Sequence, residues 1–331
     1  MLIPPKYIIT STISVYLSQI EAAKEVINAI QIPPEIEINI RRASILKSSL
    51  YSARIEGNPL TLEEINHKPS GDQKKREVFN ILKGMELVRE LGARDITVPV
   101  LLQMHEKIMT GLTDVKSLGV FRDQAEAIYN SAGIAIYLPP TPKQIQGLIE
   151  RLLKYINSDK ETFIPIRAAL SHYIFEKIHP FTDGNGRVGR LLLQSVLEKG
   201  GYGMKNLLPL EEFLDNNRSK YYRGLEEPEK DTTEYIEYIL EAIAQTSEKA
   251  RELVKTKRES EAEDYLLPRR LEILQIIKDH KLVNFDIIRR RFLKINERTL
   301  RYDLNKLAMG GFIRKRGTTK GVYYEPLNSQ S

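Results

Sequence analysis

The chain has 331 residues and no cysteine, which excludes disulfide bonds, cysteine-type zinc sites and thiol catalysis. It also lacks any run of about 18 apolar residues, the length that a helix needs to span a bilayer. The first six residues, Met-Leu-Ile-Pro-Pro-Lys, show neither the basic start nor the apolar stretch of a signal peptide. From these absences we expect a cytoplasmic chain that makes no membrane contact.

Two common nucleotide-binding motifs are missing or misplaced. No Walker sequence Gly-x4-Gly-Lys-Ser/Thr occurs in the chain. Gly184, Gly186 and Gly189 have the spacing of the dinucleotide fingerprint, but the preceding residues 168–178 repeat their apolar positions with helical spacing. Because a Rossmann glycine turn follows a buried strand, this match does not indicate a dinucleotide fold.

Histidine is scarce as well, with five in the chain, and one of them has reactive neighbours. His179 opens the segment His-Pro-Phe-Thr-Asp-Gly-Asn-Gly-Arg-Val-Gly-Arg, residues 179–190. We expect His172, seven residues earlier on a helix, to be a packed core residue.

The segment 179–190 combines the residue types that a phosphate-handling site needs. His179 can take a proton near neutral pH, and Asp183 is a hard oxygen ligand for a divalent ion. The stretch 184–186 lets backbone N–H groups turn toward an anion, and Arg187 and Arg190 share one face of the helix that begins there. A polar loop between two helices is the alternative interpretation.

This segment resembles the signature of the Fic family, His-Pro-Phe-x-[Asp/Glu]-Gly-Asn-Gly-Arg-x-x-Arg, with no departure at any defined position. The resemblance extends to residues 119–122, 128–142 and 218–222 and covers about 75–245. It implies a mainly α fold, with a Fic-type helical core and a short β-hairpin flap. It also implies a protein adenylyltransferase, an enzyme that transfers AMP from ATP to a Ser, Thr or Tyr hydroxyl of a protein.

The resemblance assigns a role to each residue of the motif. His179 would accept the proton of the attacking hydroxyl, and Asp183 would hold Mg²⁺. The ATP would be bound by the start of the following helix, that is by Gly184, Asn185, Gly186, Arg187, Val188, Gly189 and Arg190.

Two further segments are implicated by the resemblance. Tyr221 and Tyr222 match a tyrosine pair that lines the nucleotide pocket, although either could instead be a core residue. Residues 128–140 would form the flap, whose exposed edge pairs with the main chain of the target peptide. An ordinary hairpin between helices is the alternative for this segment.

A second motif lies far upstream, where Ser52-Ala-Arg-Ile-Glu-Gly-Asn58 ends a helical stretch. It resembles the inhibitory-helix motif [Ser/Thr]-x-x-x-Glu-[Gly/Asn] of autoinhibited Fic proteins. Ser52 and Glu56 are four residues apart and share one helix face. We hypothesise that Glu56 pairs with Arg190 and so removes the arginine that should hold the γ-phosphate. The alternatives are a plain helix stop and a second role for Glu56 in the reverse, de-AMPylating reaction.

The C-terminal residues form a strongly basic region. Residues 266–331 contain fifteen Lys and Arg against six Asp and Glu, a net charge of +9, whereas the whole chain carries +6. The spacing predicts helices over 268–278, 284–292 and 296–309, followed by strands 312–316 and 321–325. This order resembles a winged helix-turn-helix. In that arrangement DNA would be contacted by Arg298, Thr299 and Arg301 in a groove and by Arg314, Lys315, Arg316 and Lys320 at phosphates.

We therefore expect three regions: an N-terminal helical region over 1–92 that carries the inhibitory helix, a Fic catalytic domain over 93–258, and a winged-helix domain over 265–327. The favoured function is protein adenylyltransferase, with ATP as substrate, Mg²⁺ as cofactor and a protein target. The alternative is a transcription regulator that uses the Fic core as a nucleotide sensor. DNA or protein docking by the tail, and a homodimer, stay open.

Overall fold

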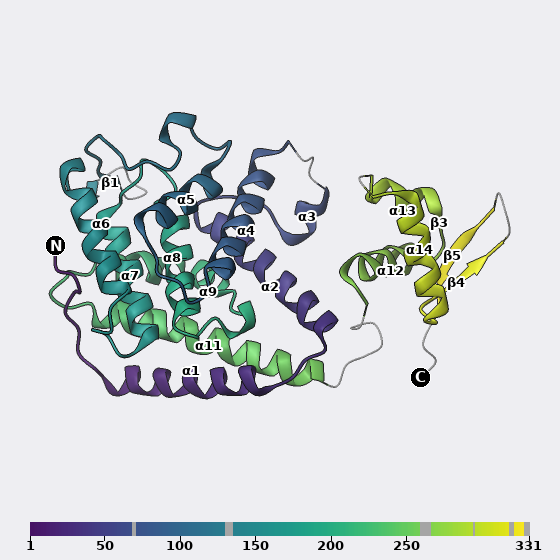
Figure 1. Ribbon diagram of the computed structural model, residues 1–331, viewed down its shortest axis with the longest axis horizontal. Helices are drawn as coiled ribbons and strands as arrows, with labels where there is room; N and C mark the ends of the chain where they lie inside the picture. The colour runs from purple at the N-terminus through teal and green to yellow at the C-terminus, as the bar shows by residue number, and fades with distance from the viewer. Residues whose placement is uncertain (68–70, 130–134, 259–265, 294, 318–320, 328–331) are drawn as a thin grey trace. The chain divides into compact units, whose positions relative to one another are not determined.

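The computed structural model describes residues 1–331 except 68–70, 130–134, 259–265, 294, 318–320 and 328–331 (Figure 1). The chain divides into two compact units. The first comprises residues 1–30 and 41–254, and the second comprises residues 31–40 and 255–331. Both are rich in helix, as the sequence predicts.

The helices up to residue 258 are α1 Ser11–Ala29, α2 Pro34–Ile55, α3 Leu62–His67, α4 Gln73–Leu91, α5 Val98–Met109, α6 Pro142–Ile156, α7 Ile164–Ile178, α8 Asn185–Lys199, α9 Leu210–Asn216, α10 Arg218–Glu226 and α11 Thr233–Arg258. Short 3-10 turns lie at Val115–Ser117 and Met204–Asn206. Helices α7 and α8 pack closely against each other, with α4, α5 and α6 packed around them (Figure 1). Nearly every residue of α7 is buried, including the polar residues Arg167, His172 and Lys177.

Helix α4 ends at Leu91, next to the boundary that we expected at residue 92. It packs against both α5 and α8, so residues 41–92 belong to the same compact unit as the motif 179–190. Apolar side chains of residues 41–92, such as Val78 and Ile81, are buried in this shared unit.

The hairpin before α6 is present as strands β1 Ile128–Tyr129 and β2 Ala135–Tyr137, which pair antiparallel. Residues 130–134 between them lie outside the described part of the chain. Helix α6 starts after Thr141, whose side chain forms a capping box with Gln144. The hairpin is thereby joined to a firmly fixed helix start.

The second unit contains α12 Pro268–His280, β3 Val283–Asn284, α13 Phe285–Arg291, α14 Glu297–Met309, β4 Ile313–Arg316 and β5 Tyr323–Pro326. The three strands form an antiparallel sheet in the order β3-β5-β4. The helices and the hairpin lie where the sequence predicts them, but strand β3 was not expected. Two residues are too few to show a period, and β3 exists because it pairs with β5.

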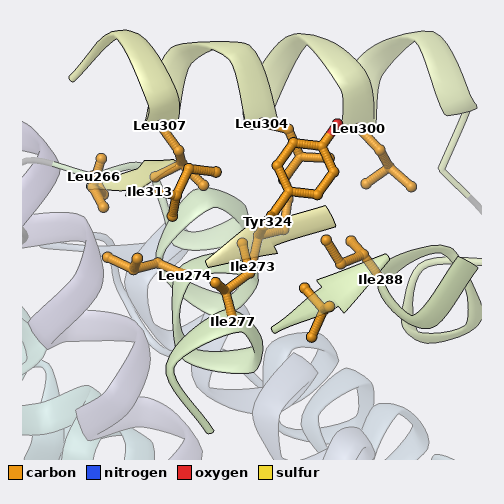
Figure 2. Close-up of a cluster of buried hydrophobic side chains, with 11 residues drawn as sticks. Leu266, Ile273, Leu274, Ile277, Ile288, Leu300, Leu304, Leu307, Ile313 and Tyr324 are labelled. Atoms are coloured by element: carbon orange, nitrogen blue, oxygen red, sulfur yellow. The ribbon is translucent and has the colours of Figure 1, made fainter. Parts of the chain in front are cut away.

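This unit has its own apolar core, shown in Figure 2. Side chains from α12, α13, α14, the sheet and the residues just before α12 meet there: Leu266, Ile273, Leu274, Ile277, Val283, Ile288, Leu300, Leu304, Leu307, Ile313 and Tyr324.

Across the described ranges of the chain, no helix combines the length and the apolar character that crossing a membrane requires.

Candidate active site

Helix α7 ends at His179, the first residue of the motif. His179 adopts the left-handed conformation, with φ 49°, while its N–H still donates to the Phe175 carbonyl at 2.9 Å. Burial lowers the pKa of the imidazole to about 4, although the backbone carbonyl of Glu176 favours the protonated ring. His179 is therefore neutral at neutral pH and can accept a proton.

The loop after His179 is fixed by two side chains. The amide of Asn185 accepts from the Phe181 N–H at 2.9 Å and donates to the Phe181 carbonyl at 2.6 Å. The ring of His105 stacks on Phe181 with centroids 3.9 Å apart and contacts the Asp183 carbonyl at 3.1 Å. The Asn185 side chain thus holds the loop. Sequence reasoning missed His105, because nothing in its neighbourhood signals a partner 78 residues away.

A third anchor is Arg122, whose side chain is buried. Its Nε donates to the His179 carbonyl at 2.8 Å, and one terminal nitrogen donates to the Pro140 carbonyl at 2.7 Å. The Arg122 N–H also donates to the Pro180 carbonyl at 2.9 Å. The arginine therefore ties the motif loop to the end of the hairpin segment, a role that the resemblance alone did not supply.

The start of α8 lies directly after this loop. Gly184 precedes the helix with φ 81°, a conformation that favours glycine. The first-turn N–H groups of a helix have no carbonyl partner within it, and the helix dipole favours an anion there. The backbone of 184–186 is thus suited to phosphate binding.

Two residues of the predicted ATP-binding set are packing residues instead. Val188 is fully buried. A Cβ at Gly189 would lie 2.0 Å from Glu176 Oε1 and 3.1 Å from Phe175, so the glycine allows α7 and α8 to approach each other. These two side-chain positions face the interior of the protein, and we correct their assignment accordingly.

Arg187 is held between two carboxylates. Its guanidinium donates to Glu77 Oε1 at 2.6 Å and to Asp183 Oδ1 at 2.9 Å. The Asp183 side chain is 59% exposed, whereas that of Arg187 is 7% exposed. Glu77 was not predicted, because it lies 110 residues away on α4.

Arg190 contacts both residues of the upstream motif, of which the sequence analysis predicted only the pairing with Glu56. Its Nε donates to Ser52 Oγ at 3.0 Å, and one terminal nitrogen donates to the Ser52 carbonyl at 3.0 Å and to Glu56 Oε1 at 2.8 Å. The Arg190 side chain is 2% exposed. Burial raises the pKa of the Glu56 carboxyl, but the charge of Arg190 outweighs this effect, so the pKa lies below its ordinary value.

A glycine makes this ion pair possible. A Cβ at Gly186 would lie 2.5 Å from Glu56 Oε1 and 3.0 Å from Arg190. The carboxylate of Glu56 therefore occupies the space directly over the first turn of α8, where an anion would bind.

The predicted tyrosine pair separates into one buried and one exposed residue. Tyr221 is 1% exposed, and its hydroxyl lies 3.0 Å from His172 Nε2. Tyr222 is 45% exposed, and its hydroxyl donates to the Ile55 carbonyl at 3.3 Å. We therefore correct Tyr221 to a core residue beneath the site, and Tyr222 alone can face a ligand.

His172 is a packed core histidine, as expected. It is fully buried, and its Nδ1 lies 2.6 Å from the Tyr235 hydroxyl. Burial lowers its pKa to about 3, so the ring is neutral. It acts as a hydrogen-bonding spacer between Tyr221 and Tyr235.

The residues present fit a magnesium ion bound together with a nucleotide. Among the described residues, no group of three or more acids and histidines could hold a metal by itself. Mg²⁺ is commonly bound through one or two carboxylates plus substrate phosphates, and the exposed Asp183 beside the start of α8 offers such a carboxylate.

Comparison with known proteins agrees with this geometry. Residues 95–197 match the model of the Fic/DOC family. The protein adenylyltransferase Fic of Drosophila melanogaster is 28% identical over 243 residues, which cover 70% of this chain and 47% of that protein. The protein of the same name from Drosophila erecta is 29% identical over 246 residues. The chain spans about half the length of these curated relatives.

Solved structures show the same fold. A Fic family protein from Desulfovibrio desulfuricans G20 superposes with a TM-score of 0.66 at 24% identity, covering 99% of both chains. Fic-1 from C. elegans superposes with a TM-score of 0.61 at 21% identity, covering 73% of both chains. Residues 95–197 therefore form a Fic domain, in a chain homologous over 70% of its length to the Fic protein adenylyltransferases.

Proposed function

We propose that this chain transfers AMP from ATP to a Ser, Thr or Tyr hydroxyl of a protein. The observation that carries the proposal is the junction of α7 and α8, where a neutral His179 and an anion-binding helix start flank one rigid loop. Relatives that carry the name protein adenylyltransferase support the same chemistry.

The reaction follows from these positions. The target oxygen bonds to the α-phosphorus of ATP, the hydroxyl proton passes to His179, and the bond to the leaving pyrophosphate breaks. The first-turn N–H groups of α8 and, once Glu56 is displaced, the guanidinium of Arg190 stabilise the phosphates. Bound Mg²⁺, held through Asp183, would neutralise part of the phosphate charge.

We also propose that Glu56 holds this activity off. Arg190 donates to Ser52 and Glu56, and the Glu56 carboxylate lies against Gly186. A γ-phosphate that is to bind Arg190 must displace a carboxylate paired inside the protein, where charge interactions are strong. Productive ATP binding therefore competes with Glu56, and basal transfer should be low.

The test is Glu56→Gly, incubated with labelled ATP and followed by mass spectrometry of the modified residue. We expect automodification to rise about tenfold or more over wild type, because the competing carboxylate is gone. The double variant Glu56→Gly with His179→Ala should be silent. Unchanged automodification in Glu56→Gly would refute the inhibitory role, and transfer that survives His179→Ala would refute the base.

The second unit supports DNA binding as an additional function. Arg298, at the start of α14, and Lys315, on β4, are exposed. Arg314 and Arg316 are also exposed, with Arg316 paired to Glu325 at 2.7 Å. A basic helix start beside a basic strand is suited to a nucleic-acid backbone.

Of the three other predicted DNA contacts, one is already paired, one is partly buried and one lies outside the described residues. Arg301 is exposed but sits over the Phe285 ring at 3.9 Å and lies 3.8 Å from Glu297. Thr299 is partly buried. Lys320 lies outside the described residues. If the chain binds DNA and ATP but modifies no protein, the transcription-regulator alternative replaces the transferase.

A further inference from the structure

A chain of three hydrogen bonds runs from the end of α2 to the carboxylate of the motif. Asn58 Nδ2 donates to Glu77 Oε2 at 2.8 Å. The guanidinium of Arg187 donates to Glu77 Oε1 at 2.6 Å and to Asp183 Oδ1 at 2.9 Å. Each oxygen of Glu77 thus has its own donor, and Arg187 links the two carboxylates.

Burial makes this chain stiff. The side chains of Arg187 and Glu77 are 7% and 15% exposed, and Asn58 is buried as well. Asp183, at the far end, is much more exposed than the other three, with 59% of its side chain accessible to solvent. A buried charge loses its hydration and is retained only where partners compensate it. Arg187 is consequently fixed by Glu77 on one side, and it fixes Asp183 on the other.

Asn58 is equally well fixed, and it lies two residues after Glu56. Its Nδ2 also donates to the Lys74 carbonyl at 2.9 Å, and its Oδ1 accepts from the Leu60 N–H at 3.1 Å. The same turn therefore reaches both arginines of the motif, Arg190 directly through Glu56 and Arg187 through Asn58 and Glu77.

We propose that Glu77 is a positioning residue for Asp183, acting through Arg187, and that Asn58 couples this positioning to the turn that carries Glu56. The proposal rests on the function proposed above, in which Asp183 holds Mg²⁺ with the nucleotide. In this scheme the main role of Arg187 is to orient the carboxylate of Asp183, which binds the metal. Movement of the turn would change the position of Arg190, which binds the γ-phosphate, and the position of Asp183 at the same time.

The test is Glu77→Gln in the full-length Glu56→Gly variant, which removes the direct inhibitory contact. Gln keeps the size of the side chain but loses the charge that holds Arg187. We expect the affinity for Mn²⁺, measured by electron paramagnetic resonance with a non-hydrolysable ATP analogue, to fall about tenfold or more, as for other partners of metal ligands. Asn58→Ala should cause a smaller loss in the same direction.

The matched control is Glu86→Gln, an exposed glutamate on the same helix, which should leave Mn²⁺ affinity unchanged. Arg187→Lys keeps the charge but cannot bridge two carboxylates, so its affinity for Mn²⁺ should fall as in Glu77→Gln. Arg187→Lys takes the place of Glu77→Gln in the test if Glu77→Gln does not fold. Unchanged Mn²⁺ affinity in the folded Glu77→Gln or Arg187→Lys variant overturns the proposal, as does an equal loss in Glu86→Gln. Failure of the proposed function looks different, since AMP transfer would be absent while Mn²⁺ and the analogue still bind.

Discussion

At the scale of single residues, burial sets which groups of the site carry charge. His179 has its pKa lowered to about 4 and stays neutral, whereas Glu56 stays ionised because Arg190 outweighs the cost of burial. A neutral imidazole and an ionised carboxylate therefore lie in the same site. The imidazole of His179 can accept a proton, and the carboxylate of Glu56 is paired with Arg190, the arginine to which ATP would bind.

The pH dependence of transfer follows from the lowered pKa of His179. In Glu56→Gly, kcat/KM for AMP transfer should stay level from neutral pH to about pH 5, and it should fall about tenfold per unit only below about pH 4, where the imidazole is protonated. The charge of Glu56 raises the pKa of His179, so removing it moves this acid limb further down. Initial rates with labelled ATP, taken where circular dichroism shows the native fold, measure the profile. An acid limb at 6.5, the ordinary histidine value, would contradict the burial argument.

At the scale of elements, the site depends on the close approach of α7 and α8. His179 ends the first helix and Gly184 begins the second, so the two axes fix the loop between them. The approach is possible because Gly189 leaves room for Glu176, whose pKa burial raises to about 8. A larger residue at this point would separate the base from the anion-binding helix start.

Gly189→Ala should therefore destabilise the fold by about 1–3 kcal/mol, because its methyl group would overlap Glu176 and Phe175. Gly147→Ala on α6 is the matched control, since no atom lies within 4 Å of the added Cβ. Alanine is the better helix former, and this control should gain about 0.5–1 kcal/mol. Urea denaturation followed by far-UV circular dichroism compares the two. Equal midpoints would show that the helix contact tolerates a side chain.

At the scale of the whole molecule, positive charge is concentrated in the C-terminal residues 266–331, which belong to the second unit. Residues 266–331 carry +9, while the chain as a whole carries +6, so the remaining residues are net negative. The second unit also has a separate apolar core (Figure 2). We expect it to recruit a polyanion, while the first unit performs the chemistry.

The DNA-binding expectation is tested by fluorescence anisotropy with a labelled duplex. Affinity should fall steadily as salt rises, because binding releases counterions from the phosphates. Arg298→Glu combined with Lys315→Glu should weaken binding about tenfold or more. The control, Lys143→Glu with Lys154→Glu, makes the same charge change at exposed positions of α6 and should have little effect. Absence of binding at low salt would leave protein docking as the role of this unit.

The sequence by itself determined the helices and the motif, and it identified Glu56 as the candidate partner of Arg190. Apolar spacing and caps such as Thr141 are local, because helix hydrogen bonds close within four residues. The motif 179–190 is contiguous, so its chemistry could be read directly. Ser52 and Glu56, on one helix face, supplied a hypothesis whose contact the structure contains.

Only the tertiary structure decided which partners these residues have. Glu77 and His105 approach the motif from 110 and 78 residues away, and no local pattern marks either of them. Packing also placed Tyr221 in the core and left Tyr222 exposed, although the two are neighbours in sequence. The physical reason is the same in each case. Helix formation depends on neighbours along the chain, whereas burial and ion pairing depend on which surfaces the helices bring together.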